Sequence, residues 1–454
     1  MKYNKEKLFI ISSLLFLISL TIFYSFRLVY YYKIENSPLP PNQNLIGVLT
    51  SQSNIVTSGD GLYETEDEYI FRGTNVNNYL YYSSRIWRII GINDDGSIKI
   101  ITDEPQTTIV WGYDSNDYNN SYIRSWLNPI DDVENTGFFY NSLDDADIYI
   151  TTSNWCADII EDVNNVSCNN IVDNDAIGLL SINDYKKAGA QNSYLKKEFY
   201  EWTINGYTDN QVWYRMPSGE LSNNSNSENS YYAHAVRPVV NIKGDIKVIS
   251  GDGKKESPFI IRKNNVDSLE QVSVGDYIDY SGYNWRVSTK NDEAVKLVMN
   301  GYIKDQNGDL ILKSFSTKGD SFNPSKIDNI GYYLNNNFYN SLSNYDYLVM
   351  GNWNSGDYNS ENNYDYKKVY DSKIEAKVGL LSVGELFVND FDSYATITGA
   401  NKNEETIYTI LADGRLFADS VETEMKVRPS IFIDITLNIV SGNGTIKNPY
   451  KISR

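Results

Sequence analysis

The sequence predicts an α+β fold in which one N-terminal transmembrane helix precedes two copies of a domain with mainly antiparallel sheets and short helices. Three observations lead to this prediction: a long uncharged stretch near the N-terminus, an internal repeat, and short β-branched runs bounded by turn-forming residues. A chain of 454 residues also exceeds the length that one hydrophobic core usually supports.

The uncharged stretch, Leu8 to Phe26, is long enough to cross a membrane, because about 20 helical residues span the hydrocarbon layer of about 30 Å. Lys2, Lys5 and Lys7 precede it, so the positive-inside rule leaves the N-terminus in the cytoplasm and the bulk of the chain outside the cell. The alternative is a cleaved signal peptide, but its apolar core is usually shorter and ends in a small-residue site, which does not follow here.

The rest of the chain contains one ordered series of segments twice. The matching pairs are Trp87-Arg88 with Trp285-Arg286, Ser125–Asn128 with Tyr332–Asn335, Asn154-Trp155 with Asn352-Trp353, Ile177–Tyr185 with Val378–Leu386, Val236–Ile242 with Val427–Ile433, and Ser250–Ile261 with Ser441–Ile452. Trp87 and Trp155 are 68 positions apart (155 − 87), and so are Trp285 and Trp353 (353 − 285). The expected organisation is a cytoplasmic N-terminus (residues 1–7), a transmembrane anchor (8–30), a linker (31–46), a first copy (47–263) and a second copy (264–454).

Local signals predict the elements of each copy. In the first, Trp87–Ile92 and Ser97–Ile101 flank the turn-forming Asn93–Gly96, which is typical of a hairpin. A short helix follows, capped by Asn120 or Ser121, and its counterpart in the second copy runs through Gly-Tyr-Tyr-Leu-Asn-Asn-Asn-Phe-Tyr.

Two further signals follow in both copies. Gly-Leu-Leu-Ser is the end of a buried strand, and an acid three residues after its serine resembles a helix-capping pattern, in Ser181–Asp184 and Ser382–Glu385. Val-Arg-Pro then leads into a Val/Ile strand, and the last strand carries Pro258 or Pro449, which suits an edge position.

This order of motifs resembles an uncharacterised domain of extracellular proteins from low-GC Gram-positive bacteria. That domain is similar to the C-type-lectin-like and formylglycine-generating-enzyme-like folds, so the resemblance implies two C-type-lectin-like domains that usually serve binding. It covers Tyr69–Arg262 and Val266–Arg454. The cysteine pair that formylglycine chemistry needs late in the domain is missing from the sequence.

The candidate ligand-binding residues are in the first copy. Trp202, Trp213 and Tyr214 have no tryptophan counterpart in the second copy and lie among Gly, Asn and Ser, so with Arg215 they are candidates for stacking a sugar or peptide. Residues that recur in both copies are expected to be structural, with ligand contact as the alternative. These are Trp87, Trp155, Trp285, Trp353, Arg237 and Arg428.

Cys156 and Cys168 are the only cysteines, and outside the cell such a pair most often forms a disulfide. A thiol nucleophile or metal pair is the less favoured alternative, because the two are not in a Cys-x-x-Cys spacing. His234 is the single histidine, and the sequence has no Gly-x-Ser-x-Gly motif of the kind that carries the nucleophile in many serine hydrolases. We therefore assign no catalytic residue.

Charge limits the partners. The net charge of −19 argues against nucleic acid, whose phosphates need basic clusters. We assign no cofactor, and the sequence does not identify a metal site. The alternative is a calcium site, because acidic clusters could supply oxygen ligands. Those acids are Asp144, Asp145, Asp147, Asp173, Asp175, Asp357 and Glu361.

We therefore expect a non-enzymatic, single-pass cell-membrane protein whose bulk is extracellular and binds a glycan, a peptide or a wall component. Two alternatives remain at this stage. One is an extracellular hydrolase of wall or host polymers, and the other is a structural envelope protein without a small ligand.

Overall fold

The computed structural model describes residues 43–454, with gaps at 52–53, 114, 130–138, 209, 224–231, 263–265, 320, 386–392 and 402–404. The expected anchor, most of the linker and the boundary between the copies therefore lie outside the described residues. Among the described helices, none has both the length and the apolar character needed to span a membrane.

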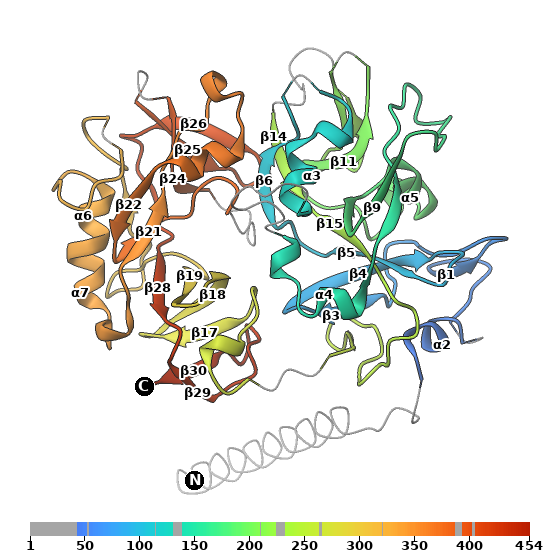
Figure 1. The fold of residues 1–454 in the computed structure, drawn as a ribbon, viewed down its shortest axis with the longest axis horizontal. Helices are drawn as coiled ribbons and strands as arrows, with labels where there is room; N and C mark the ends of the chain where they lie inside the picture. The colour runs from blue at the N-terminus through green and yellow to red at the C-terminus, as the bar shows by residue number, and fades with distance from the viewer. Residues whose placement is uncertain are drawn as a thin grey trace, which may run out of the picture.

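The first copy contains two sheets, and most of their strand pairs are antiparallel (Figure 1). The larger sheet has the order β1-β2-β4-β5-β15-β10, with β3 paired to β4, β16 to β3 and β7 to β15. Its strands are β1 (Gly61–Glu64), β2 (Tyr69–Arg72), β3 (Tyr79–Tyr82), β4 (Arg85–Ile92), β5 (Ile98–Thr102), β7 (Ile150–Thr151), β10 (Ile177–Leu179), β15 (Pro238–Ile242) and β16 (Phe259–Ile260). The predicted hairpin is confirmed as β4–β5.

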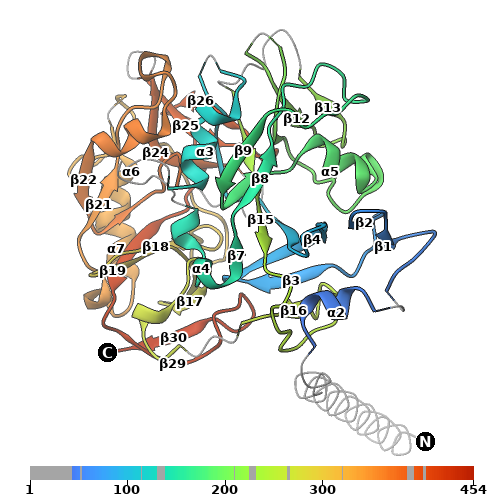
Figure 2. The same ribbon diagram turned by 45° about the vertical axis from the view of Figure 1, so that its right-hand side comes forward.

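The smaller sheet of the first copy has the order β13-β12-β11-β14-β6, and a separate two-stranded arm is formed by β8 and β9. These strands are β6 (Thr107–Val110), β8 (Ser153–Cys156), β9 (Ile171–Asp175), β11 (Glu201–Gly206), β12 (Val212–Arg215), β13 (Leu221–Ser222) and β14 (Ala233–Val236). In Figure 2 the β8–β9 arm lies beside helix α5 (Ile182–Lys187).

The helices of the first copy are short. Besides α5 they are α2 (Leu45–Leu49), α3 (Tyr122–Leu127) and α4 (Ala146–Tyr149). Ser121 caps α3 and Ser181 caps α5, because each side chain accepts the backbone N–H three residues later, so both capping predictions are confirmed. Leu45 is buried and its N–H donates to the carbonyl of Ile246, so the packed region begins before the expected start at residue 47.

The second copy repeats both sheets. Its larger sheet has the order β23-β28-β19-β18-β17-β30-β29, its smaller sheet β20-β27-β24-β25-β26, and β21–β22 forms the arm. The strands are β17 (Tyr277–Tyr280), β18 (Tyr283–Lys290), β19 (Ala294–Met299), β20 (Leu312–Lys313), β21 (Gly351–Asn354), β22 (Lys373–Ala376), β23 (Val378–Gly379), β24 (Tyr394–Asn401), β25 (Thr406–Ile410), β26 (Leu416–Ser420), β27 (Met425–Lys426), β28 (Ser430–Asp434), β29 (Asn438–Ser441) and β30 (Tyr450–Ser453).

The helix of the second copy that matches α3 is irregular. It consists of α6 (Ile330–Tyr332), a π-helical stretch η5 (Tyr333–Phe338) and α7 (Tyr339–Ser341). The helix expected after Ser382 begins as a turn, and the residues that would continue it lie outside the described part of the chain.

Equivalent side chains make equivalent bonds in the two copies. The indoles of Trp87 and Trp285 donate to the carbonyls five residues earlier, at 2.9 and 3.0 Å. The guanidinium groups of Arg237 and Arg428 donate to the carbonyls of Thr102 and Met299, at 2.7 and 2.9 Å. The duplicated sequence motifs thus correspond to duplicated contacts inside the fold.

A tryptophan pressed against a glycine holds each arm to its sheet. A Cβ atom at Gly178 would lie 2.4 Å from the ring of Trp155, and one at Gly379 would lie 2.4 Å from the ring of Trp353. Each indole also donates to a backbone carbonyl of its own arm, at 3.0 Å in both copies. Only glycine leaves room for the ring at these positions.

Each copy has a hydrophobic core of its own, and a loop of the second copy also packs into the core of the first. Residues 355–372 of the second copy contribute Tyr358, Tyr366 and Val369 to the core of the first. The hydroxyl of Tyr358 accepts the N–H of Val110 at 3.1 Å, and the indole of Trp126 donates to the carbonyl of Gly384 at 3.0 Å. The copies therefore pack as one body.

A buried carboxyl lies at a second contact between the copies. Asp276 accepts the hydroxyl of Ser84 from the first copy and the N–H of Ser273 at 2.8 Å. Burial raises the pKa of Asp276 to about 7, and Asp144 adds to the rise, whereas the two hydrogen bonds and Arg85 oppose it. The folded chain therefore keeps this carboxyl protonated up to a higher pH than an exposed aspartate.

We predict that Gly178→Ala destabilises the protein by about 1–3 kcal/mol, because the added methyl group would overlap the ring of Trp155. The measurement is the midpoint of chemical denaturation of the purified full chain. Gly399→Ala is the matched control, because a Cβ there meets no atom within 4 Å. Equal midpoints for the two variants would contradict the packing described above.

We also predict that Asp276 makes a pH-dependent contribution to the free energy of unfolding, which the variant Asp276→Asn lacks. Because the folded-state pKa of about 7 lies above the ordinary value of 3.8, the contribution of Asp276 is complete below pH 3.8 and is lost as the pH rises to 7. The wild type should lose about 1.4 kcal/mol per pH unit relative to the variant across this window. Denaturation midpoints of both proteins from pH 4 to 8 measure the difference, and parallel curves would disprove it.

Candidate functional site

The first copy contains a pocket of about 540 Å³ between its arm, helix α5 and the β4–β5 turn. Its lining is mostly polar and comes from elements far apart in the sequence. Six of the lining residues carry the argument below: Asn93, Lys99, Asn154, Ser181, Asn183 and Asp184. A concave site with a few convergent polar groups is the usual form of a binding site.

An ion pair lies in the wall of this pocket. The ammonium group of Lys99 on β5 is 3.1 Å from both carboxylate oxygens of Asp184, at the start of α5. The Ser181 hydroxyl donates to the same carboxylate at 2.8 Å. Asp184 is therefore held in place by three bonds, and Lys99 keeps part of its side chain accessible from the pocket.

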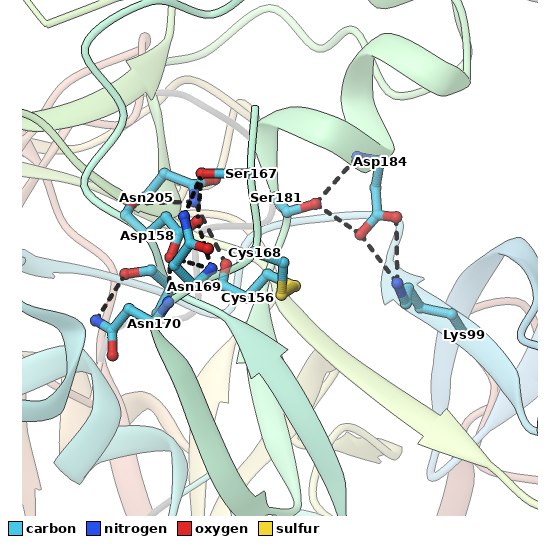
Figure 3. The surroundings of a disulfide bond; sticks show 11 residues. Lys99, Cys156, Asp158, Ser167, Cys168, Asn169, Asn170, Ser181, Asp184 and Asn205 are labelled. Atoms are coloured by element: carbon cyan, nitrogen blue, oxygen red, sulfur yellow. Dashed lines mark hydrogen bonds and ion pairs between the residues drawn. A yellow bond between two sulfur atoms is a disulfide. The ribbon is translucent and has the colours of Figure 1, made fainter. Parts of the chain in front are cut away.

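The disulfide forms another wall, which confirms the predicted pairing of Cys156 and Cys168 (Figure 3). The loop that it closes is fixed from inside by Asp158. This carboxylate accepts the N–H groups of Asn169, at 2.9 Å, and Asn170, and the hydroxyl of Ser167, at 3.1 Å. The covalent link and the buried carboxylate together keep the loop at the pocket rim.

Carboxamides complete the pocket, and they fall into two groups. Asn205 and Asn241 are buried and tie neighbouring elements together: Asn205 accepts the N–H of Ile182 at 2.9 Å, and Asn241 accepts from Asn93 at 3.0 Å.

The second group is available to a ligand. Asn154 and Asn183 are exposed and line the pocket, and neither side chain hydrogen-bonds to another described residue. A carboxamide both donates and accepts, so it can pair with hydroxyl or amide groups of a bound molecule.

The same position is closed in the second copy. Lys296 and Glu385 replace Lys99 and Asp184, and the ammonium group lies 2.8 and 2.9 Å from the two carboxylate oxygens. The acid is buried in both copies, but the lysine side chain is 19 % exposed in the first copy and 2 % exposed in the second. Asn354, in the place of Cys156, donates to Glu385 at 3.0 Å. Burial acts to raise the pKa of Glu385, but Lys296 and the Ser382 hydrogen bonds outweigh it, so the pKa is lowered. This pair is part of the core.

The four residues predicted to bind ligand are buried, so that expectation is corrected. Their exposed fractions are 0 % for Trp202, 8 % for Trp213, 2 % for Tyr214 and 0 % for Arg215. The indole of Trp202 donates to the carbonyl of Ile109 at 3.0 Å. A stacking platform needs an exposed ring face, which these side chains do not have.

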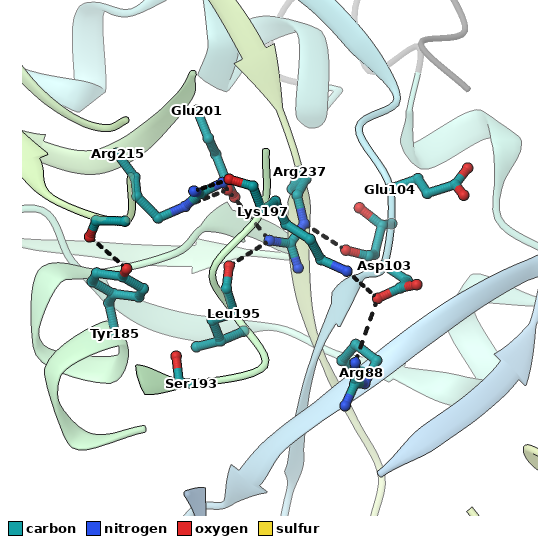
Figure 4. A network of polar contacts seen from close by, with 12 residues as sticks. Arg88, Asp103, Glu104, Tyr185, Ser193, Leu195, Lys197, Glu201, Arg215 and Arg237 are labelled. Atoms are coloured by element: carbon teal, nitrogen blue, oxygen red, sulfur yellow. Dashed lines mark hydrogen bonds and ion pairs between the residues drawn. The ribbon is translucent and has the colours of Figure 1, made fainter. Parts of the chain in front are cut away.

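Arg215 instead belongs to a buried ionic network (Figure 4). Arg215 and Arg237 reach one oxygen of Glu201 at 2.7 and 3.3 Å. Lys197, which ion-pairs with Asp103 at 2.5 Å, lies nearby; burial and then Arg237 lower the pKa of Lys197 to about 8. These bonds connect chain segments inside the fold, and none of these residues lines the pocket beside the disulfide.

The second copy has a cation–π contact where the first copy has this ion pair. Tyr394 occupies the position of Glu201, and Ile410 that of Arg215. The guanidinium of Arg428 lies 5.0 Å from the centre of the Tyr394 ring. The recurring arginine thus keeps its hydrogen bond to a backbone carbonyl in both copies, but its side-chain partner is a carboxylate in the first copy and an aromatic ring in the second.

Three of the seven acids suggested as calcium ligands, Asp144, Asp145 and Asp175, form ion pairs with arginine. Asp175 pairs with Arg124 at 2.7 Å, and Asp144 pairs with Arg262 at 3.1 Å. Within the described ranges, no group of three His, Cys, Asp or Glu side chains is arranged to hold a metal ion.

The sequence analysis did not predict the residues that line the pocket, although one sequence pattern contains two of them, Ser181 and Asp184. The acid three residues after the serine recurs in both copies, and its capping role is confirmed for Ser181. Its second role, pairing with a lysine on the hairpin, depends on the contact between α5 and β5, which the local pattern does not contain.

Comparison of the chain with protein-family models, with curated proteins and with solved structures finds no match. The function is therefore inferred from the geometry of the pocket.

We predict that replacing both cysteines (Cys156→Ser with Cys168→Ser) lowers stability by about 3 kcal/mol, because the short loop between them is no longer restricted in the unfolded chain. The denaturation midpoint of the purified full chain gives the change. The control is the wild type under reducing conditions, which should shift equally. A variant as stable as the oxidised wild type would contradict this role.

Proposed function

We propose that this chain is a membrane-anchored bacterial surface protein whose first copy binds an extracellular glycan, peptide or wall component in the pocket beside the disulfide. The observation that carries this proposal is the difference between the copies. The equivalent lysine–acid pair lines a pocket in the first copy, where Lys99 is partly exposed, and lies in the core of the second, where Lys296 is buried.

The pocket has the size and chemistry of a binding site. Its volume of about 540 Å³ lies within the range of about 300–1,000 Å³ typical of ligand sites. Asn154 and Asn183 offer both donors and acceptors, while Lys99 and Asp184 offer a fixed positive and negative charge. A ligand rich in hydroxyl or amide groups matches these side chains.

Two features other than the pocket support the proposed location of the chain at the cell surface. The uncharged stretch from Leu8 to Phe26, with lysines before it, favours a helix that leaves the bulk of the chain outside the cell. A structural disulfide persists in oxidising surroundings and is rare in the cytosol. Both features agree with a binding domain displayed at the cell surface.

We predict that Asn154→Ala weakens ligand binding about fivefold or more, because it removes an exposed hydrogen-bonding group from the pocket. The purified full chain is screened on arrays of glycans, peptides and peptidoglycan fragments, and the hits are measured by titration. Asn352→Ala is the matched control, because Asn352 occupies the same exposed position on the arm of the second copy.

Three results would overturn the proposal. Binding that Asn352→Ala weakens and Asn154→Ala leaves intact would place the site in the second copy. Turnover of a polymer would favour the hydrolase alternative. Absence of binding to every probe class would favour a structural envelope protein.

A further inference from the structure

A second hollow, of about 470 Å³, adjoins the pocket of the first copy. The two hollows share four lining residues, namely Glu68, Asn93, Asp94 and Lys187. They are therefore two parts of one groove, which runs from the disulfide to the turn between β1 and β2. We call the part beside the disulfide the inner hollow and the part beside this turn the outer hollow.

An ion pair marks the boundary between the hollows. Lys187, in the last turn of α5, pairs with Glu68, which precedes β2. Both side chains are partly exposed, 37 % for Lys187 and 23 % for Glu68. Asn93 and Asp94, from the β4–β5 turn, line both hollows as well. A ligand that fills both hollows must pass these four side chains.

The lining of the groove favours a hydroxylated chain. Of the apolar residues in the inner hollow, Trp155, Leu179 and Ile204 are at most 5 % exposed, and only Val166 is partly exposed. The groove therefore offers little apolar surface to an apolar peptide side chain. The outer hollow adds Thr65, Glu66 and Asp67, which are polar. Carboxylates, carboxamides and hydroxyls pair well with the hydroxyl groups of sugars.

Resting on the proposed function, we infer that the ligand of the first copy is a linear oligosaccharide that occupies both hollows. One end lies against Lys99, Asp184 and Asn154 in the inner hollow. The chain continues past Lys187 and Glu68 into the outer hollow. A single sugar unit would fill only the inner part of this groove.

The test is the dependence of affinity on chain length. The probes are glucose, mannose and N-acetylglucosamine oligomers of one to six units and polar peptides of matching lengths, titrated against the purified full chain. Affinity for the bound sugar series should rise about tenfold or more with length and level off once the groove is filled, because added units form new hydrogen bonds, some to charged groups.

A variant at the boundary separates the two hollows. Lys187→Gln should lower the affinity for long oligomers about tenfold and that for the single unit much less, since it removes a charged partner at the boundary between the hollows. Asn154→Ala should weaken short and long oligomers alike. Lys318→Gln is the matched control, because Lys318 is an exposed lysine of the second copy.

The outcomes distinguish this inference from the proposed function. Sugar affinity that does not depend on length, or binding of peptides in place of sugars, would overturn the extended glycan site while leaving a ligand-binding pocket. Failure of sugars, peptides and peptidoglycan fragments alike would overturn the proposed function itself.

Discussion

The packing of Trp155 against Gly178 is the contact on which the pocket depends. The glycine lies on β10 of the large sheet, and the absence of a side chain there lets the indole ring lie directly on the backbone. Trp155 thereby fixes the β8–β9 arm, and the next residue, Cys156, starts the disulfide that walls the pocket. Asn154, on the other side of the tryptophan, is then exposed toward a ligand. One close contact thus positions both the wall and a binding group.

Duplication preserved this contact and changed what surrounds it. In the second copy Trp353 lies on Gly379 in the same way, yet Asn354 stands where the first copy has a cysteine. That asparagine bonds to Glu385 and helps to seal the lysine–acid pair. The loop between the arm strands, residues 355–372, packs into the core of the first copy. The second copy therefore supports the first, while the first keeps an open pocket.

The prediction of the ligand-binding residues failed for a physical reason. Trp202, Trp213 and Tyr214 lie among Gly, Asn and Ser, a composition typical of exposed loops, and they lack tryptophan counterparts in the second copy. Neither observation distinguishes an exposed loop from a buried strand. A strand that is covered on both faces also has aromatic residues at successive positions. Strand β11 is buried along its whole length, and β12 likewise. The rings therefore serve packing, and the polar residues of the groove line the binding surface.

The amino-acid sequence by itself determined the duplicated order of elements, the β4–β5 hairpin, the capped helices and the cysteine pair, because each depends on residues close together in the chain. Only the tertiary structure decided which lysine meets which acid, and whether that pair is open or sealed. Lys99 and Asp184 are 85 positions apart, and they meet because α5 packs beside β5. Replacement of cysteine by asparagine on the arm, and of aspartate by glutamate after the serine, accompanies the change from a partly exposed lysine to a buried one. The sequence does not show this change, since accessibility depends on every neighbour that packs around a group.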